Sequence, residues 1–151
     1  MRAVDLMGID IATLAYLAGS SANDEIIKRL HEIGHKGVRM SHGYVIQHLV
    51  DEEPKVGELG DLLGVTQQAA SKQLLELERF GYVRRVPDRA DARIRRAQLT
   101  DKGRRLVDDS RRLRRELDVH GDEETKRALV RLLVATGGAE KVLKRRVVEA
   151  D

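Results

Sequence analysis

Residues 53–103 decide the fold of this chain, and they read EPKVGELGDLLGVTQQAASKQLLELERFGYVRRVPDRADARIRRAQLTDKG. Apolar residues recur at helical spacing between positions 56 and 63, which predicts a short helix. Gly64 follows, where a glycine can adopt the left-handed conformation that ends a helix. Thr66 then stands at an N-cap position and predicts a second helix over residues 67–80. The stretch therefore predicts two short helices joined by a tight turn.

The second predicted helix has one apolar face and one polar face. Ala70, Leu74 and Leu77 fall within roughly 60° of one another on a helical wheel, so we expect them to be buried. Amide, hydroxyl and cationic groups lie opposite or beside this stripe, and such groups can hydrogen-bond to base edges in the major groove. The expected base-reading region comprises the base readers Gln67, Gln68, Ser71 and Lys72, together with Thr66 at the helix N-cap as a further DNA-binding candidate. The alternative is an ordinary solvated helix surface.

An arginine-rich β-hairpin is predicted directly after this helix. Residues 82–86 and 94–99 have the composition of strands, and residues 88–93 connect them. Residues 79–115 carry 14 basic and 5 acidic side chains, whereas the rest of the chain carries 14 basic and 20 acidic ones. The net charge of +3 therefore hides a strongly polarised chain. Concentrated positive charge beside a helix that can contact bases is typical of proteins that bind duplex DNA. The alternative is a run of charged side chains that contact only solvent.

These residues resemble the winged helix-turn-helix of the MarR family (multiple-antibiotic-resistance regulators). The matching segments are residues 56–59, 62–66, 77–83, 88–93 and 99–103, and the stretch that they span is about a third of the chain. The resemblance implies a dimer whose second helix enters the major groove and whose wing arginine reaches the minor groove or its phosphates. It places that role on Arg93, braced by Asp91 through a charge-assisted hydrogen bond. Ala92 replaces a residue that is often basic in the family, so Arg89, Arg95 and Arg96 are alternatives for the inserting arginine.

The predicted fold is mainly α with a small β-hairpin wing, a winged helix-turn-helix with N- and C-terminal dimerisation helices. Residues 1–52 are expected to supply dimerisation and effector helices, residues 53–100 the DNA-binding region, and residues 101–151 further dimerisation helices, all in one intertwined domain. Besides the base-reading region, the candidate DNA contacts are Arg79, Arg89, Asp91, Arg93 and Arg95.

The flanking segments predict four more helices, over residues 7–35, 41–50, 101–119 and from 122 onward. Low helix propensity at residues 19–23 allows a kink or a break in the first of them. Thr100 and Asp122 are the expected N-caps of the last two, and a basic tail follows at residues 141–146. Apolar seams on the first and last helices predict a homodimer, so the DNA partner should be a double-stranded, near-palindromic operator.

The resemblance implies that a small aromatic or anionic effector binds between the dimer helices and the reading region. The polar candidates there are Tyr16, His35, Arg39, His42 and Tyr44. A metal- or pH-responsive regulator that uses His31, His35 and His42 is the alternative. His31 and His35 stand one helical turn apart, which suits two ligands of a divalent metal, and histidines titrate near neutral pH. Surface or interface histidines are the commoner outcome, and no cofactor is expected.

The composition narrows the function further. The 151 residues suit one domain, and the absence of cysteine excludes disulfides, cysteine-ligated metals and thiol redox sensing. The longest apolar stretch near the N-terminus, residues 11–19, is about half of a membrane span, so a cytoplasmic protein without a membrane partner is expected. No catalytic motif is recognisable, which argues against an enzyme. The remaining rivals are a winged-helix protein-interaction module and a non-specific architectural DNA binder.

Overall fold

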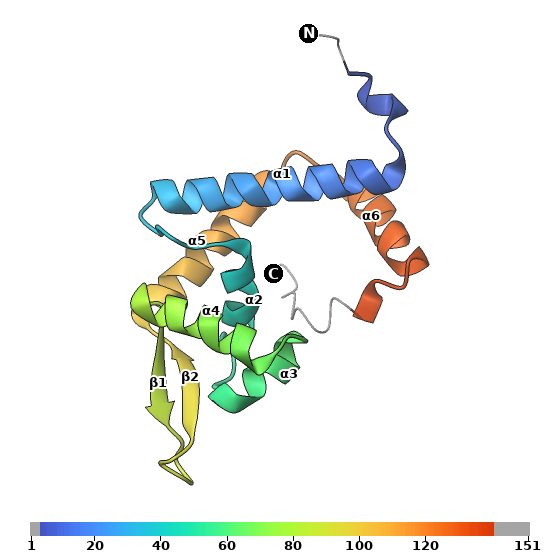
Figure 1. Cartoon of the computed structure of the whole chain (residues 1–151). Helices are drawn as coiled ribbons and strands as arrows, with labels where there is room; N and C mark the ends of the chain where they lie inside the picture. Colours follow the sequence, from blue (N-terminus) through green and yellow to red (C-terminus); the bar gives the residue numbers. More distant parts are fainter. Residues whose placement is uncertain (1–3, 141–151) are drawn as a thin grey trace.

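The computed structural model describes residues 4–140, which form six α-helices, two short 3₁₀-helices (η) and one β-hairpin (Figure 1). In chain order the elements are η1 (Leu6–Gly8), α1 (Ile11–Glu32), α2 (Met40–Gln47), η2 (Val56–Glu58), α3 (Leu59–Leu63), α4 (Gln67–Arg79), β1 (Val83–Pro87), β2 (Arg95–Leu99), α5 (Asp101–Asp118) and α6 (Glu123–Ala135). The predicted fold class, mainly α with a hairpin wing, is confirmed. Figure 1 shows α1 across one end of the molecule and the hairpin projecting from the opposite end.

Helix α1 is one unbroken helix of 22 residues. Asp10 caps it by accepting a hydrogen bond from the Thr13 amide at 2.9 Å, so the helix begins later than predicted. No break occurs at residues 19–23, because each residue there costs less than about 1 kcal/mol in propensity and buried Ile26 and Leu30 anchor the same helix farther on. The helix ends at Glu32, earlier than predicted, and Gly34 has a φ of 107° in the turn that follows.

The helix-turn-helix forms as its local signals predict. Gly64 ends α3 with a φ of 68°. The Thr66 hydroxyl then accepts a hydrogen bond from the Ala69 amide at 3.1 Å and caps α4. The apolar stripe of α4 is fully buried (Ala70, Leu74 and Leu77), where it packs against α2 and α3. This packing leaves the opposite face of α4 at the surface.

The wing is an antiparallel hairpin tied to its neighbours along the outer edge of β2 and at its base. β1 and β2 pair from Val83 opposite Leu99 to Pro87 opposite Arg95. The Ala97 amide donates to the Pro54 carbonyl at 2.9 Å, which attaches the segment before η2 to β2. At the base of the wing, Thr100 caps α5, so the last strand leads directly into that helix.

Gly103 brings α5 into direct contact with the base of the wing. A Cβ at this position would lie only 2.2 Å from the Tyr82 carbonyl oxygen. Tyr82 itself is fully buried, and its carbonyl accepts a hydrogen bond from the Thr100 amide at 3.0 Å. The wing and α5 therefore meet backbone to backbone, with no side chain between them.

Two helical faces are left uncovered. The core joins the C-terminal half of α1 to α2, α4, α5 and the wing, whereas no described residue of α6 is buried. Ile11 at the start of α1 is 72% exposed, and Leu129 on α6 is 52% exposed. Asp122 caps α6 as predicted, and the basic tail at residues 141–146 lies outside the described residues. Within residues 4–140, no helix is long and apolar enough to cross a membrane.

Candidate nucleic-acid interface

The exposed face of α4 presents polar side chains that the protein itself does not use. Gln68, Lys72 and Arg79 are all exposed, and their side chains make no hydrogen bond or ion pair with another residue of the described chain. Gln68 and Lys72 are four positions apart, so they point from the same side of the helix. Their donors and acceptors are available to a ligand that lies along α4.

Gln67 and Ser71 differ from these neighbours, because their side chains are bonded within the helix-turn-helix. The Gln67 amide group donates to the Val56 carbonyl at 2.8 Å and accepts from the Gly60 amide at 3.1 Å. It also donates to the Ser71 hydroxyl at 3.4 Å. Of the four residues predicted to read bases, Gln68 and Lys72 thus have unbonded side chains. Thr66, the further DNA-binding candidate, is used as a cap.

At the tip of the wing, Arg93 is held in an exposed position by a neighbouring carboxylate. Arg93 donates to both carboxylate oxygens of Asp91, with Nε and Nη2 each 3.0 Å from their acceptors. This hydrogen bond is the main cause of a lowered pKa at Asp91. The Arg93 side chain remains 91% exposed. The structure therefore contains the pairing that the resemblance implied, and it fixes a guanidinium at the wing tip without burying it.

The three wing arginines that were the alternatives to Arg93 fall into two groups. Arg96 is half-buried, where it is hydrogen-bonded to Asp88 and donates to the Glu53 carbonyl at 2.7 Å. This contact is the main reason for a lowered pKa at Asp88. Arg89 and Arg95, by contrast, are exposed and unpaired within residues 4–140. Among the alternatives to Arg93, Arg96 is thus held inside the fold and the other two face solvent.

A buried histidine ties α2 to the inner side of α4. His42 is fully buried, its Nδ1 accepts from the Arg39 amide at 3.1 Å, and its Nε2 lies 2.8 Å from Glu76. Because Nδ1 is an acceptor, Nε2 carries the proton and donates to the carboxylate. This bond is the main cause of a lowered pKa at Glu76, which is also paired with the Arg39 side chain. α4 is therefore anchored to the α1–α2 connection through one carboxylate.

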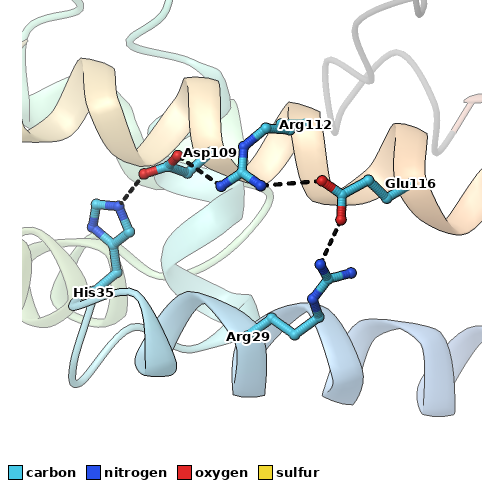
Figure 2. Close-up of polar contacts among 5 residues, drawn as sticks. All are labelled: Arg29, His35, Asp109, Arg112 and Glu116. Carbon is cyan, nitrogen blue, oxygen red and sulfur yellow. Dashed lines mark hydrogen bonds and ion pairs between the residues drawn. The ribbon is translucent and has the colours of Figure 1, made fainter.

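A second buried histidine, His35, bonds to α5 and to Tyr82, the residue just before β1; Figure 2 shows the contact with α5 through Asp109. His35 Nε2 lies 2.8 Å from Asp109 on α5, and its Nδ1 lies 3.2 Å from the Tyr82 hydroxyl. The bond from His35 is the main cause of a lowered pKa at Asp109. Arg112 bridges Asp109 to Glu116 with two bonds of 3.1 Å. Glu116 in turn pairs with Arg29 of α1, so this ladder of charges joins α1 to α5.

The expected effector and metal residues do not form one cluster. Tyr16 is 73% exposed on α1, whereas His35 and His42 belong to the two separate networks above. Arg39 shares the network of His42. The prediction that His31 and His35 share a helix face is wrong, because α1 ends at Glu32. His31 is instead bonded to the Val38 carbonyl at 2.8 Å. Residues 4–140 contain no group of three or more side chains placed to hold a metal ion.

Two acidic residues of these networks were not singled out from the sequence. Glu76 lies next to the buried stripe of α4, and Asp109 occupies a similar flank of α5, beside Leu106 and Leu113. A carboxylate at the edge of an apolar stripe is a weak signal for a buried partner, and it does not identify that partner.

Comparison with known proteins supports the winged-helix assignment. Residues 36–94 match the model described as MarR family, and a search of the curated proteins finds no match. Among solved structures, YusO from Bacillus subtilis aligns with a TM-score of 0.64 at 18% identity, covering 91% of this chain and 99% of that one. A mutant MarR from E. coli complexed with operator DNA has the same TM-score and identity, with 89% and 99% of the two chains covered. The PcaV transcriptional regulator from Streptomyces coelicolor, in complex with its natural ligand, has a TM-score of 0.59 at 21% identity, with 93% and 99% covered.

These likenesses concern the fold. The predicted resemblance is confirmed: the central segment matches the family model, and the chain has the MarR-type winged-helix architecture over most of its length.

Proposed function

Starting from a winged helix-turn-helix that matches the MarR family, we propose that this chain is a sequence-specific, DNA-binding transcriptional regulator. One observation carries the proposal. On the exposed face of α4, the side chains of Gln68, Lys72 and Arg79 make no hydrogen bond or ion pair within residues 4–140, while the adjacent wing holds Arg93 at its tip against Asp91. A helix with free donors and acceptors beside a fixed, exposed cation suits simultaneous contact with a major groove and the neighbouring minor groove.

The proposed contacts divide into two kinds. Gln68 can pair with adenine and Lys72 can donate to the acceptors of guanine, so these two side chains read bases. Arg79, Arg89 and Arg95 face solvent and neutralise phosphates, which fixes the register of the protein on the duplex but carries little sequence information. Because the arginines contact phosphates, the affinity for DNA should depend on the salt concentration, whereas the preference among DNA sequences should depend on the side chains of α4.

We propose that the protein binds DNA as a homodimer. The exposed apolar residues of α1 and α6 include Ile11, Leu14, Leu129 and Val130, and large apolar surfaces of this kind mark sites of association. Residues 1–52 and 101–151 then supply the dimer contacts, and residues 53–100 supply the DNA contacts. Two α4 helices related by a two-fold axis would meet major grooves about 34–36 Å apart, on a near-palindromic operator.

We also propose that the dimer is a repressor that a small molecule releases. The S. coelicolor regulator was solved with its natural ligand, which supports ligand binding by this architecture. Arg39 and His42 are the candidates nearest to the reading helix, because both contact Glu76 of α4. Tyr16, His35 and Tyr44 complete the candidate set. An effector acts only if it favours the dimer with mis-spaced reading helices over the dimer that fits the operator.

The test is selection from a randomised duplex library, followed by fluorescence-anisotropy titration of the selected duplex and a scrambled one at two salt concentrations. We expect a near-palindromic sequence and a preference of about 10³ or more that persists at the higher salt. Equal and steeply salt-dependent binding to both duplexes would replace the proposal with an architectural role. Absence of binding at low salt would favour a protein-interaction module.

A further inference from the structure

Two adjacent glutamines begin α4, and the structure places them in opposite situations. The Gln68 side chain is exposed and makes no hydrogen bond within residues 4–140. Both the oxygen and the nitrogen of the Gln67 amide group are hydrogen-bonded within the protein. Oε1 accepts from the Gly60 amide, and Nε2 donates to the Val56 carbonyl and the Ser71 hydroxyl. The main-chain partners fix the orientation of this amide, because Gly60 N–H can only donate and the Val56 carbonyl can only accept.

The Gln67 side-chain amide supplies a hydrogen-bond acceptor that the start of helix α3 lacks. α3 has only five residues, and its N-cap residue, Glu58, makes no side-chain capping bond. The first amides of a helix have no partner inside that helix. Gly60 is one of these, and Gln67 satisfies it from the next helix, seven residues further along the chain. Gln67 therefore caps α3 from α4.

The backbones of the two helices also meet at this point. A Cβ on Gly60 would lie 2.9 Å from both the Cα and the backbone nitrogen of Gln67. Gly60 is buried, and α3 packs on α4 around it. The hydrogen bonds of Gln67 and the missing side chain of Gly60 thus act at the same contact, which sets the angle between the two helices.

A glutamine that reads adenine needs one free donor and one free acceptor pointing away from the protein. Both protons of the Gln67 Nε2 are already directed at Val56 and Ser71. Gln67 would have to break these bonds, and release the Gly60 amide, before it could pair with a base. Gln68 has no such bonds to break.

We infer that Gln67 is a positioning residue, which holds α4 at a fixed angle to α3, and that Gln68 alone of the pair reads a base. This inference rests on the proposed DNA-binding function and refines it. Gln67 acts on DNA only through the placement of α4, so its loss should affect all base contacts together.

The experiment compares Gln67→Ala, Gln67→Glu and Gln68→Ala in the full chain, with Gln68→Ala as the matched control. The first measurement is hydrogen exchange of the Gly60 amide in the DNA-free protein. The second is the base preference at each operator position, measured by anisotropy with single-substituted duplexes. Glutamate at position 67 keeps an oxygen for Gly60 but loses the donor to Val56, so it separates capping from the rest of the side chain.

We expect Gln67→Ala to speed exchange at Gly60 by about tenfold, the order of one lost hydrogen bond. It should weaken binding to every duplex by a common factor of about tenfold, with the preferred sequence unchanged. Gln67→Glu should keep Gly60 exchange slow. Gln68→Ala should leave Gly60 exchange unchanged and abolish the preference at one base pair of each half-site.

The inference is overturned if Gln67→Ala leaves Gly60 exchange at the wild-type rate, or if it removes the preference at a single base pair. A wild-type protein without any base preference would instead refute the proposed regulator. The Gly60 measurement would still decide whether Gln67 braces the helix-turn-helix. If the alanine variant does not fold, Gln67→Leu, which keeps most of the side-chain volume but has no acceptor for the Gly60 amide, supplies that measurement.

Discussion

A single methyl group at position 103 tests how closely the wing is tied to α5. In Gly103→Ala the new Cβ would lie 2.2 Å from the Tyr82 carbonyl oxygen and 3.0 Å from Leu99 Cδ2. That carbonyl also accepts the Thr100 amide, so it cannot retreat without disturbing the start of α5. Overpacking costs about 1–3 kcal/mol, from which the better helix propensity of alanine subtracts up to about 1 kcal/mol. Because the clash is with backbone, we expect a net loss of about 2 kcal/mol and a melting temperature lower by about 4–8 °C.

The matched control is Gly43→Ala, the same substitution inside α2. A Cβ there would meet nothing within 4 Å, so propensity alone acts and the melting temperature should rise by up to about 4 °C. Both variants and the wild type are compared by circular-dichroism melts at one protein concentration, since the stability of an oligomer depends on concentration. If Gly103→Ala melts at or above the wild-type temperature, the backbone contact between wing and α5 is not as tight as we describe.

Three further outcomes are expected. Arg96→Ala should lower the melting temperature by a few degrees, because it removes a half-buried contact with Asp88. Arg93→Ala changes a side chain that is 91% exposed, so it should leave the melting temperature unchanged and weaken DNA binding in anisotropy titrations. The reverse pattern would contradict the structural role of Arg96 and the DNA-binding role of Arg93. The bond from His42 lowers the pKa of Glu76 below its ordinary value of 4.5. The stabilisation is therefore complete above pH 4.5 and is lost as the pH falls through the folded-state pKa, so the melting deficit of Glu76→Gln should shrink in acid, and a constant deficit would refute this origin. Light scattering should give the wild type twice the 17.0 kDa chain mass and Leu129→Asp a smaller particle, and a wild-type monomer would exclude the dimer.

The features that the sequence predicted well are those whose causes lie within a few residues. The turn at Gly64 and the caps at Thr66 and Thr100 each depend on one residue and on amides up to three positions away. The buried stripe of α4 depends on the helical period alone. Such signals locate the helix-turn-helix and its exposed face without any knowledge of the tertiary structure.

The features that it predicted poorly depend on partners far along the chain. His35 is bonded to a residue 74 positions away, and His42 to one 34 positions away, so a local pattern could group the histidines but could not assign their contacts. Gln67 resembles Gln68 in sequence and differs from it only through bonds to Val56 and Gly60. Its role as a positioning residue therefore could not be separated from base reading before the two helices were placed.

Helix α5 connects the base of the wing to the part of the chain that leads into α6. Its 18 residues make a rod of about 27 Å. A rotation of only about 5° around its far end would displace the wing end by about 2 Å, more than half of the 3.4 Å step between successive base pairs. A small change in the angle of α5 at its far end would therefore displace the wing by a distance comparable to the spacing between base pairs.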